Sequence, residues 1–229
     1  MNGLLLVDKP KGWTSFDVVA KVRGVIARYT KEQGLPRIKV GHTGTLDPMA
    51  TGVLVLAIGS YTKKIATLTK HDKSYEATVT LGATSNTDDA EGTLTVVRAS
   101  QPSFQEITEV LQQFVGTIQQ VPPQFSAIKV GGVRSYAAAR KGKEVELVAR
   151  NVTIYSISDI SYAYPLVQFT AHVGSGTYIR SIARDVGERL GVGAYLSDLR
   201  RTRVGDFTLD QAIDPTDISI DTIKEKLLA

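Results

Sequence analysis

The chain contains no cysteine, and its three histidines, His42, His71 and His172, are far apart in the sequence. The lack of cysteine excludes disulfides, thiolate metal sites and cysteine nucleophiles. Scattered histidines argue against a zinc site, because zinc ligands recur at short spacings. No apolar run reaches the roughly 18 residues that span a bilayer, and the N-terminus lacks the residue order of a signal peptide. We therefore expect a cytoplasmic protein without a structural metal.

The 229 residues are enough for one large domain or two closely packed ones. Apolar residues make up 42% and charged residues 22%, as in ordinary soluble globular proteins. No repeat, low-complexity tract or linker-like stretch divides the chain.

The net charge of +4 is too small to indicate a polyanionic partner by itself. Each basic cluster taken alone is typical of a solvated face, but together they favour a nucleic-acid surface. The clusters are Lys9/Lys11, Lys63/Lys64, Lys70/Lys73, Arg134/Arg140/Lys141/Lys143 and Arg200/Arg201/Arg203.

Apolar periodicity in the first part of the chain predicts two kinds of strand and one long helix. Residues 2–7 form a short expected strand, and Thr14 or Ser15 caps a helix with an apolar stripe from Val18 to Tyr29. The run 53–58 has no polar alternation, which suits a strand buried on both faces. Residues 75–81 alternate as in a half-buried strand.

Later segments add strands and helices without regular interleaving. Ser103 and Glu106 form a capping box before a helix, and strands are expected at 152–160, 166–173 and 195–204. Thr177 is expected to cap a helix, and residues 217–228 to form a terminal helix. This order predicts an α+β fold with a mixed or antiparallel sheet.

Asp47 lies in the glycine-rich segment 41–54, directly before the apolar run. Glycines allow tight bends, while Pro48 fixes its own φ and biases Asp47 toward extended backbone. The carboxylate is thus held on a stiff corner. Local patterns alone favour ordinary turn chemistry over a reactive group.

Arg180 falls in the first turn of the expected helix, where a cation opposes the helix dipole. A carboxylate partner such as Asp47 would compensate and would itself stay ionised, although a solvated arginine is an equal alternative. The turn Gly174-Ser175-Gly176 could receive a phosphate at the helix start. Tyr75 and Tyr178 are either core residues or faces on which a flipped base stacks.

Five motifs in order together resemble the TruB family of tRNA pseudouridine synthases. They are Lys9-Pro-x-Gly12-x-x-Ser15, Gly41-His-Thr-Gly-Thr-Leu-Asp-Pro-x-Ala-Thr-Gly-Val-Leu54, Pro123-x-x-Ser-Ala-Ile-Lys129, Gly176-Thr-Tyr-Ile-Arg180 and Leu199-Arg-Arg201. The resemblance covers residues 3 to about 207. It implies the pseudouridine-synthase fold, a mixed and mainly antiparallel sheet with flanking helices and a central active-site cleft.

The resemblance also implies an activity and a set of site residues. The activity is isomerisation of uridine 55 in the tRNA T loop to pseudouridine, with base flipping. By motif position, Asp47 is the catalytic aspartate, Tyr75 packs on the base and Arg180 pairs with Asp47. The substrate-contacting positions are His42, Tyr75, Tyr178 and Leu199.

The implied chemistry needs no cofactor, metal or second substrate, since the leaving uracil is also the incoming group. Hydrolytic glycosidases use two carboxylates, whereas this motif offers one, which suits a rearrangement. Attack of the carboxylate on C1′ and removal of the C2′ proton both remain open. We expect the T arm of tRNA as partner, recognised largely by its shape, with no membrane and no obligatory protein partner, and a monomer.

Two departures limit the resemblance. Ser85-Asn86-Thr87 stands where the family commonly has Thr-Asp-Thr, so no role is assigned to that turn. We expect a catalytic domain at 1–210 and a short tail at 211–229 without a full RNA-binding domain of the PUA type. Two alternatives remain: an RNA-binding or RNA-folding module in which catalysis is secondary or lost, and a guide-dependent relative like dyskerin.

Overall fold

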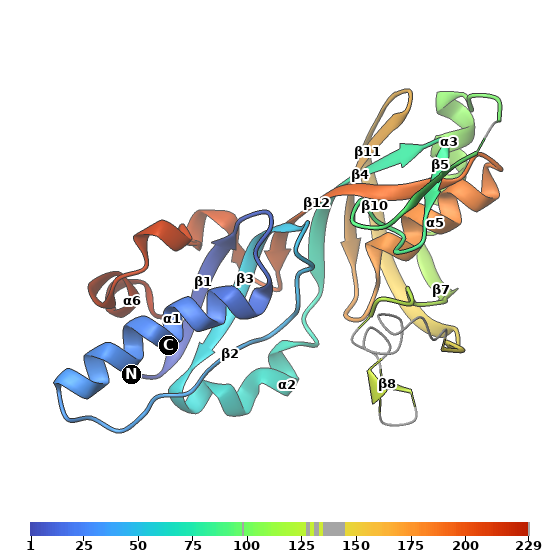
Figure 1. Ribbon diagram of the computed structural model, residues 1–229. Coiled ribbons are helices and arrows are strands. Elements are labelled where there is room, and N and C mark those ends of the chain that lie inside the picture. The colour runs from blue at the N-terminus through green and yellow to red at the C-terminus, as the bar shows by residue number, and fades with distance from the viewer. Residues whose placement is uncertain (98, 127–128, 131–132, 135–144, 229) are drawn as a thin grey trace. The chain divides into compact units, whose positions relative to one another are not determined.

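The computed structural model describes residues 1–97, 99–126, 129–130, 133–134 and 145–228 (Figure 1). The chain divides into two compact units. The first comprises Met1–Tyr75 and Leu199–Ala229, and the second comprises Glu76–Asp198. Strands β4 (Lys73–Leu81) and β12 (Ala194–Val204) each run from one unit into the other.

The sheet of the first unit is organised around β3 (Thr51–Ile58). Strand β1 (Gly3–Lys9) pairs with β3 in antiparallel register along its whole length. Strand β2 (Val40–His42) pairs antiparallel with residues 56–58 of β3, and β12 pairs parallel with residues 51–52. Strand β13 (Phe207–Thr208) closes a hairpin with β12. Residues 53–58 are all buried, as the run without polar alternation predicts.

Helix α1 (Ser15–Glu32) begins after Thr14, one of the two caps that the sequence predicts, and the structure adds a capping box with Asp17. The Thr14 hydroxyl accepts a hydrogen bond from the Asp17 amide, and the Asp17 side chain accepts one from the Thr14 amide. Val18, Val22 and Ile26 lie on one stripe and are buried against β1 and β3. The sheet-facing stripe and the cap together fix both the start and the face of the helix.

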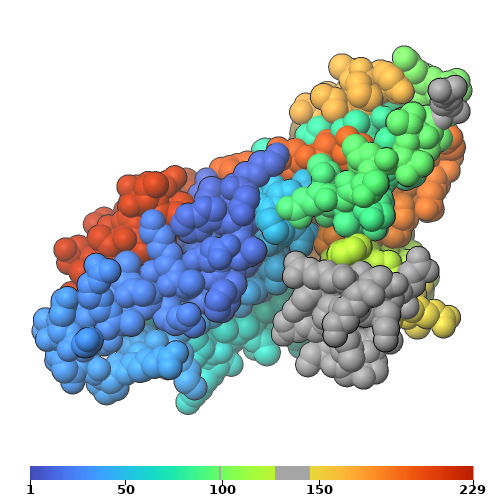
Figure 2. Space-filling view, in the orientation of Figure 1, coloured from blue at the N-terminus to red at the C-terminus, as the bar shows by residue number. Residues whose placement is uncertain are grey.

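The C-terminal segment packs into the same core through Ile213, Ile218 and Ile223. The prediction of a single helix at 217–228 is wrong in extent: a 3₁₀ turn at Pro215–Asp217 precedes α6 (Ile220–Lys226). Extended Ser219 separates them and caps α6, and Leu228 pairs with Leu4 of β1. In the space-filling view this segment, in red, lies against the blue N-terminal part of its own unit (Figure 2).

Three short elements complete the first unit. Two of them, η1 (Gly59–Lys64) and α2 (Ile65–Leu68), follow β3, and η2 (Leu209–Gln211) follows β13.

The second unit contains a sheet in which β4 is followed in order by β11 (Leu166–Val173), β10 (Arg150–Ala163) and β7 (Gly116–Gln120). Helices α3 (Phe104–Gln112) and α5 (Ile179–Arg189) belong to the same unit, and α3 begins at the predicted Ser103/Glu106 capping box. The other strands of this unit form two separate pairs, β5 (Ala83–Ser85) with β6 (Leu94–Val96) and β8 (Lys129–Val130) with β9 (Val133–Arg134). Among the pairings given for described strands, only β3 with β12 is parallel, so the predicted α+β fold with a mainly antiparallel sheet is confirmed.

The start of α5 differs from the prediction that Thr177 caps it. Tyr178 is the N-cap residue, and its side chain makes no capping hydrogen bond. The buried Gln120 side chain of β7 hydrogen-bonds to the backbone of the N-cap residue instead. Its Oε1 accepts from the Tyr178 amide at 2.8 Å, and its Nε2 donates to the Tyr178 carbonyl at 3.1 Å. A side chain distant in sequence therefore fixes the helix start.

Candidate active site

Asp47 lies in the loop 43–50, which leaves β2 and enters β3. Both of its neighbours are fixed by hydrogen bonds. On one side, the hydroxyl of Ser15 at the start of α1 accepts from the Leu46 amide at 2.8 Å and donates to the Leu46 carbonyl at 3.0 Å. Ser15 and Leu46 are both buried, so this pair of hydrogen bonds is shielded from water.

On the other side of Asp47, the Pro48 carbonyl accepts from the Gly12 amide at 2.8 Å and from the Lys9 ammonium at 3.3 Å. The Ala50 amide donates to the carbonyl of Asp47 itself at 3.1 Å and closes a turn. The half-buried carboxylate thus projects from backbone that is held on both sides.

Arg201 of β12 holds the two ends of this segment. Its side chain is 2% exposed, and it donates to the carbonyls of Val53 at 2.8 Å, Gly44 at 3.1 Å and Thr45 at 3.4 Å. One guanidinium therefore joins the start of β3 to the residues that precede Asp47.

These contacts correct the interpretation of several basic clusters as a nucleic-acid surface. Lys9, Lys73 and Arg201 are buried, because backbone carbonyls surround their charges. Arg200 pairs with Asp8 at 2.7 Å, and Arg203 pairs with Asp72 at 3.0 Å. Lys11, Lys63, Lys64 and Lys70 are exposed. The side chains of the cluster at 134–143 lie outside the described residues.

Three further predicted site residues belong to the first unit: His42 in β2, Tyr75 in β4 and Leu199 in β12. Tyr75 and Leu199 are each 8% exposed. Burial, and secondarily the charge of Arg201, lowers the pKa of His42, which favours the neutral imidazole. The same two causes, burial first, lower the pKa of Lys73 to about 8.

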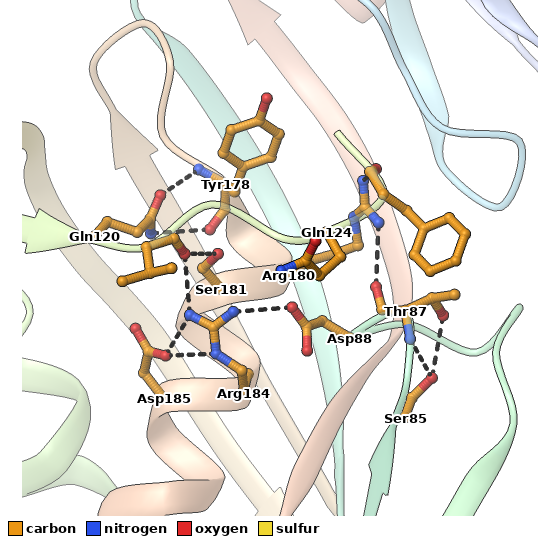
Figure 3. Close-up of polar contacts among 12 residues, drawn as sticks. Ser85, Thr87, Asp88, Gln120, Gln124, Tyr178, Arg180, Ser181, Arg184 and Asp185 are labelled. Carbon is orange, nitrogen blue, oxygen red and sulfur yellow. Dashed lines mark hydrogen bonds and ion pairs between the residues drawn. The ribbon is translucent and has the colours of Figure 1, made fainter. Parts of the chain in front are cut away.

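Arg180 lies in the second unit, in the first turn of α5, and is 5% exposed. It forms a buried ion pair with Asp89 at 3.1 Å and donates to the carbonyls of Thr87 at 3.1 Å and Phe125 at 2.9 Å. Figure 3 shows Arg180 beside the turn that carries Thr87. The carboxylate that offsets a cation at a helix start is thus present in Asp89.

The turn around residues 85–89 therefore has a role that the sequence did not indicate. Besides the pair of Asp89 with Arg180, Asp88 pairs with Arg184 at 3.0 Å, one helical turn further along α5 (Figure 3). Burial raises the pKa of Asp88, while Arg184 and Arg180 lower it. Two adjacent aspartates fasten this turn to the helix that bears Arg180. The signal in the sequence is the pair Asp88-Asp89 in a turn, matched by Arg180 and Arg184 at a spacing of four.

Tyr178, also in the second unit, lies under the guanidinium of Arg150, whose Cζ is 5.1 Å from the ring centroid. Arg150 also donates to the Gly176 carbonyl, so the turn that the sequence indicated as a phosphate site is tied to β10. The predicted residues thus fall into two groups, His42, Asp47, Tyr75 and Leu199 in one unit and Tyr178 and Arg180 in the other. Pairing of Arg180 with Asp47 stays a prediction.

Within the described residues, no group of three or more histidine, aspartate or glutamate side chains could hold a metal ion. Within the same residues, no helix combines the length and apolarity needed to cross a membrane.

The chain is similar to known proteins in both its sequence and its fold. Residues 30–179 match the family described as TruB family pseudouridylate synthase (N terminal domain), and residues 180–228 match the tRNA pseudouridylate synthase B C-terminal domain. The chain belongs to the TruB family. Tyr178 falls in the first matched region and Arg180 in the second.

Curated relatives of the TruB family match nearly the whole chain. The tRNA pseudouridine synthase B of Paenarthrobacter aurescens is 48% identical over 93% of this chain and 68% of its own length. That of Parabacteroides distasonis is 44% identical over 94% of this chain and 91% of its own. Among solved structures, a chain of a Cbf5-Nop10-Gar1 complex superposes with a TM-score of 0.69 and is 31% identical. The match covers 98% of this chain and 57% of that one.

Proposed function

We propose that this TruB-family protein isomerises uridine 55 in the T loop of tRNA to pseudouridine, with Asp47 as the catalytic carboxylate. The observation that carries the assignment to Asp47 is the fixation of both of its neighbours, Leu46 by Ser15 and Pro48 by Gly12 and Lys9. A carboxylate that attacks a sugar must be held in register with it, since small misplacements cost much of the rate.

The reaction breaks the N1–C1′ bond, turns the uracil within the site and forms a C5–C1′ bond. The proton on C5 is lost, and N1 gains a proton, so atoms balance without any co-reactant. The carboxylate of Asp47 either bonds to C1′ or removes the C2′ proton; the two routes share the need for its ionised form. The proposal involves no metal and no cofactor.

The remaining site residues are proposed to bind the flipped uridine and its surroundings. Tyr75 packs on the base, and His42, Tyr178 and Leu199 contact the RNA. Arg180, held by Asp89 within its own unit, would keep the Asp47 carboxylate ionised. Flipping costs a few kcal/mol in a duplex and least where the nucleotide is already unpaired, which favours a loop substrate.

The relatives favour tRNA over a guide-dependent substrate. The curated relatives that are named tRNA pseudouridine synthase B are 44–49% identical to this chain, against 31% for the chain of the Cbf5-Nop10-Gar1 complex. We propose a cytoplasmic monomer that recognises the T arm without an obligatory protein partner.

Tritium release from T-arm RNA containing 5-tritiated uridine tests this function. The C5 hydrogen leaves only if the glycosidic bond moves to C5, so the protein alone should release tritium. A matched RNA with cytidine at position 55 and tritiated uridine elsewhere should release none. No release from the first RNA would refute the enzyme and favour an RNA-folding module. Equal release from both would refute the choice of position 55.

A further inference from the structure

Arg201 is buried at a place where a charged side chain carries a large desolvation penalty. Its side chain is 2% exposed, and the hydrogen bonds found for its guanidinium all go to backbone carbonyls, those of Gly44, Thr45 and Val53. Its charge lowers the pKa of His42 and that of Lys73, so nearby basic groups oppose it further. An apolar side chain of similar volume is often at least as stabilising at such a place, so packing alone does not account for the arginine.

The contacts of Arg201 bracket Asp47 along the chain. Gly44 and Thr45 precede it and Val53 follows it, so one rigid fork spans the segment between the two ends. The backbone of Arg201 also pairs with Gly52 in the parallel β3–β12 register. Strand β12 therefore controls where the Asp47 segment enters the sheet.

We propose that Arg201 is a positioning residue for the reaction: its guanidinium fixes the path of residues 44–53 and so places the Asp47 carboxylate. This rests on the proposed function, because it assumes that Asp47 acts on the substrate. Ser15, Gly12 and Lys9 hold the two neighbours of Asp47, and Arg201 holds the ends of the segment.

The test compares Arg201→Met and Arg201→Lys with the parent in two measurements. The first is the single-turnover rate of tritium release at saturating enzyme, beside the Kd for T-arm RNA. Arg201→Met should lower the rate roughly 10- to 100-fold, as a small misplacement does, and leave the Kd within about twofold. Arg201→Lys should recover only part of the rate, since a single ammonium lacks the planar fork whose separate nitrogens reach Val53 on one side and Gly44 and Thr45 on the other.

The matched control is Ile223→Ala, which removes buried side-chain volume from α6, a helix of the same unit that packs on α1 and β1. It should lower the unfolding temperature but keep the rate when assayed well below that temperature. Rate losses in Ile223→Ala equal to those in Arg201→Met would show a general stability effect and overturn the proposal. Unchanged rates in both arginine variants would overturn it as well.

The second measurement is amide hydrogen exchange of the segment 43–53, which reports the path of the loop without any substrate. Exchange should increase there in Arg201→Met and stay at the parental rate in Ile223→Ala. Unchanged exchange in Arg201→Met would refute the proposal. If the parent releases no tritium, the proposed function fails, and exchange still decides whether Arg201 holds the segment.

Discussion

The buried cations around Asp47 donate hydrogen bonds to backbone carbonyls, which replace the water that would otherwise solvate their charges. The ammonium of Lys9, fully buried, donates to the carbonyls of Pro10, Trp13 and Pro48. Arg201 makes the same kind of contact on the other side of the segment. A buried charge without such partners would cost several kcal/mol. The cations therefore hold the turn in place, and the carbonyls of the turn in return stabilise the buried cations.

Lys73 gives a pH-dependent prediction. Its folded pKa of about 8 lies below the ordinary 10.5, so between these values the unfolded chain binds more protons and stability rises with pH. Lys73→Met removes this titration. The stability of the variant relative to the parent should therefore fall by roughly 1–2 kcal/mol from pH 7 to pH 10.

Urea unfolding of both proteins at the two pH values measures the difference directly. Titrations of other groups cancel in the comparison, because they are common to parent and variant. A stability of the variant relative to the parent that stays constant, or that rises with pH, would contradict the lowered pKa of Lys73.

At the scale of elements, the junction of β3 and β12 is the tightest point near Asp47. Gly52 has a φ of +104°, and a Cβ there would lie 2.1 Å from the carbonyl oxygen of Arg201. The backbone of β12 leaves no room for a side chain. The sequence places Gly52 in a turn motif, whereas the physical reason for it is a strand that is distant in sequence.

Gly52→Ala should therefore destabilise the protein strongly, by on the order of 3 kcal/mol or more, through strain and a steric clash. Gly24→Ala in α1 is the control, because a Cβ there meets nothing within 4 Å and its φ lies outside the unfavourable positive range. The control should stabilise by about 0.5–1 kcal/mol. Thermal unfolding decides: Gly52→Ala with a parental midpoint would refute the close approach.

Local patterns predicted the longer strands and helices, since caps and apolar periodicity act over a few residues. The cap at Thr14, the Ser103/Glu106 capping box and the buried run 53–58 are confirmed. Two of the misses involve distant partners: Gln120 replaces a local cap at Tyr178, and Asp89 reaches Arg180 from a turn given no role. No short-range pattern encodes such contacts, so only the fold shows them.

At the scale of the whole molecule, the charge is distributed differently from the sequence clusters. Several cations are internal, while Lys11, Lys63, Lys64 and Lys70 remain exposed. With a net charge of only +4, and with several of the clustered cations buried or paired with carboxylates, we expect moderate rather than extreme electrostatic binding of RNA. Shape recognition of the T loop would then supply most of the specificity.

The salt dependence of T-arm binding tests this distribution. With about four phosphate contacts, the affinity should fall roughly 100-fold between 50 and 200 mM salt. Replacing Lys63 and Lys64 together by glutamine should make the logarithmic slope shallower by up to about two. Filter binding over a salt series measures both, and an affinity independent of salt would contradict the expected phosphate contacts.

The central claim is that Asp47 is the one reacting carboxylate of this TruB-family protein. Its most direct test is single-turnover tritium release by Asp47→Asn on T-arm RNA at enzyme concentrations above its measured Kd. The variant keeps the shape of the side chain and loses the charge. RNA binding should stay intact with no detectable tritium release, whereas release at the parental rate would show that Asp47 is not the reacting carboxylate.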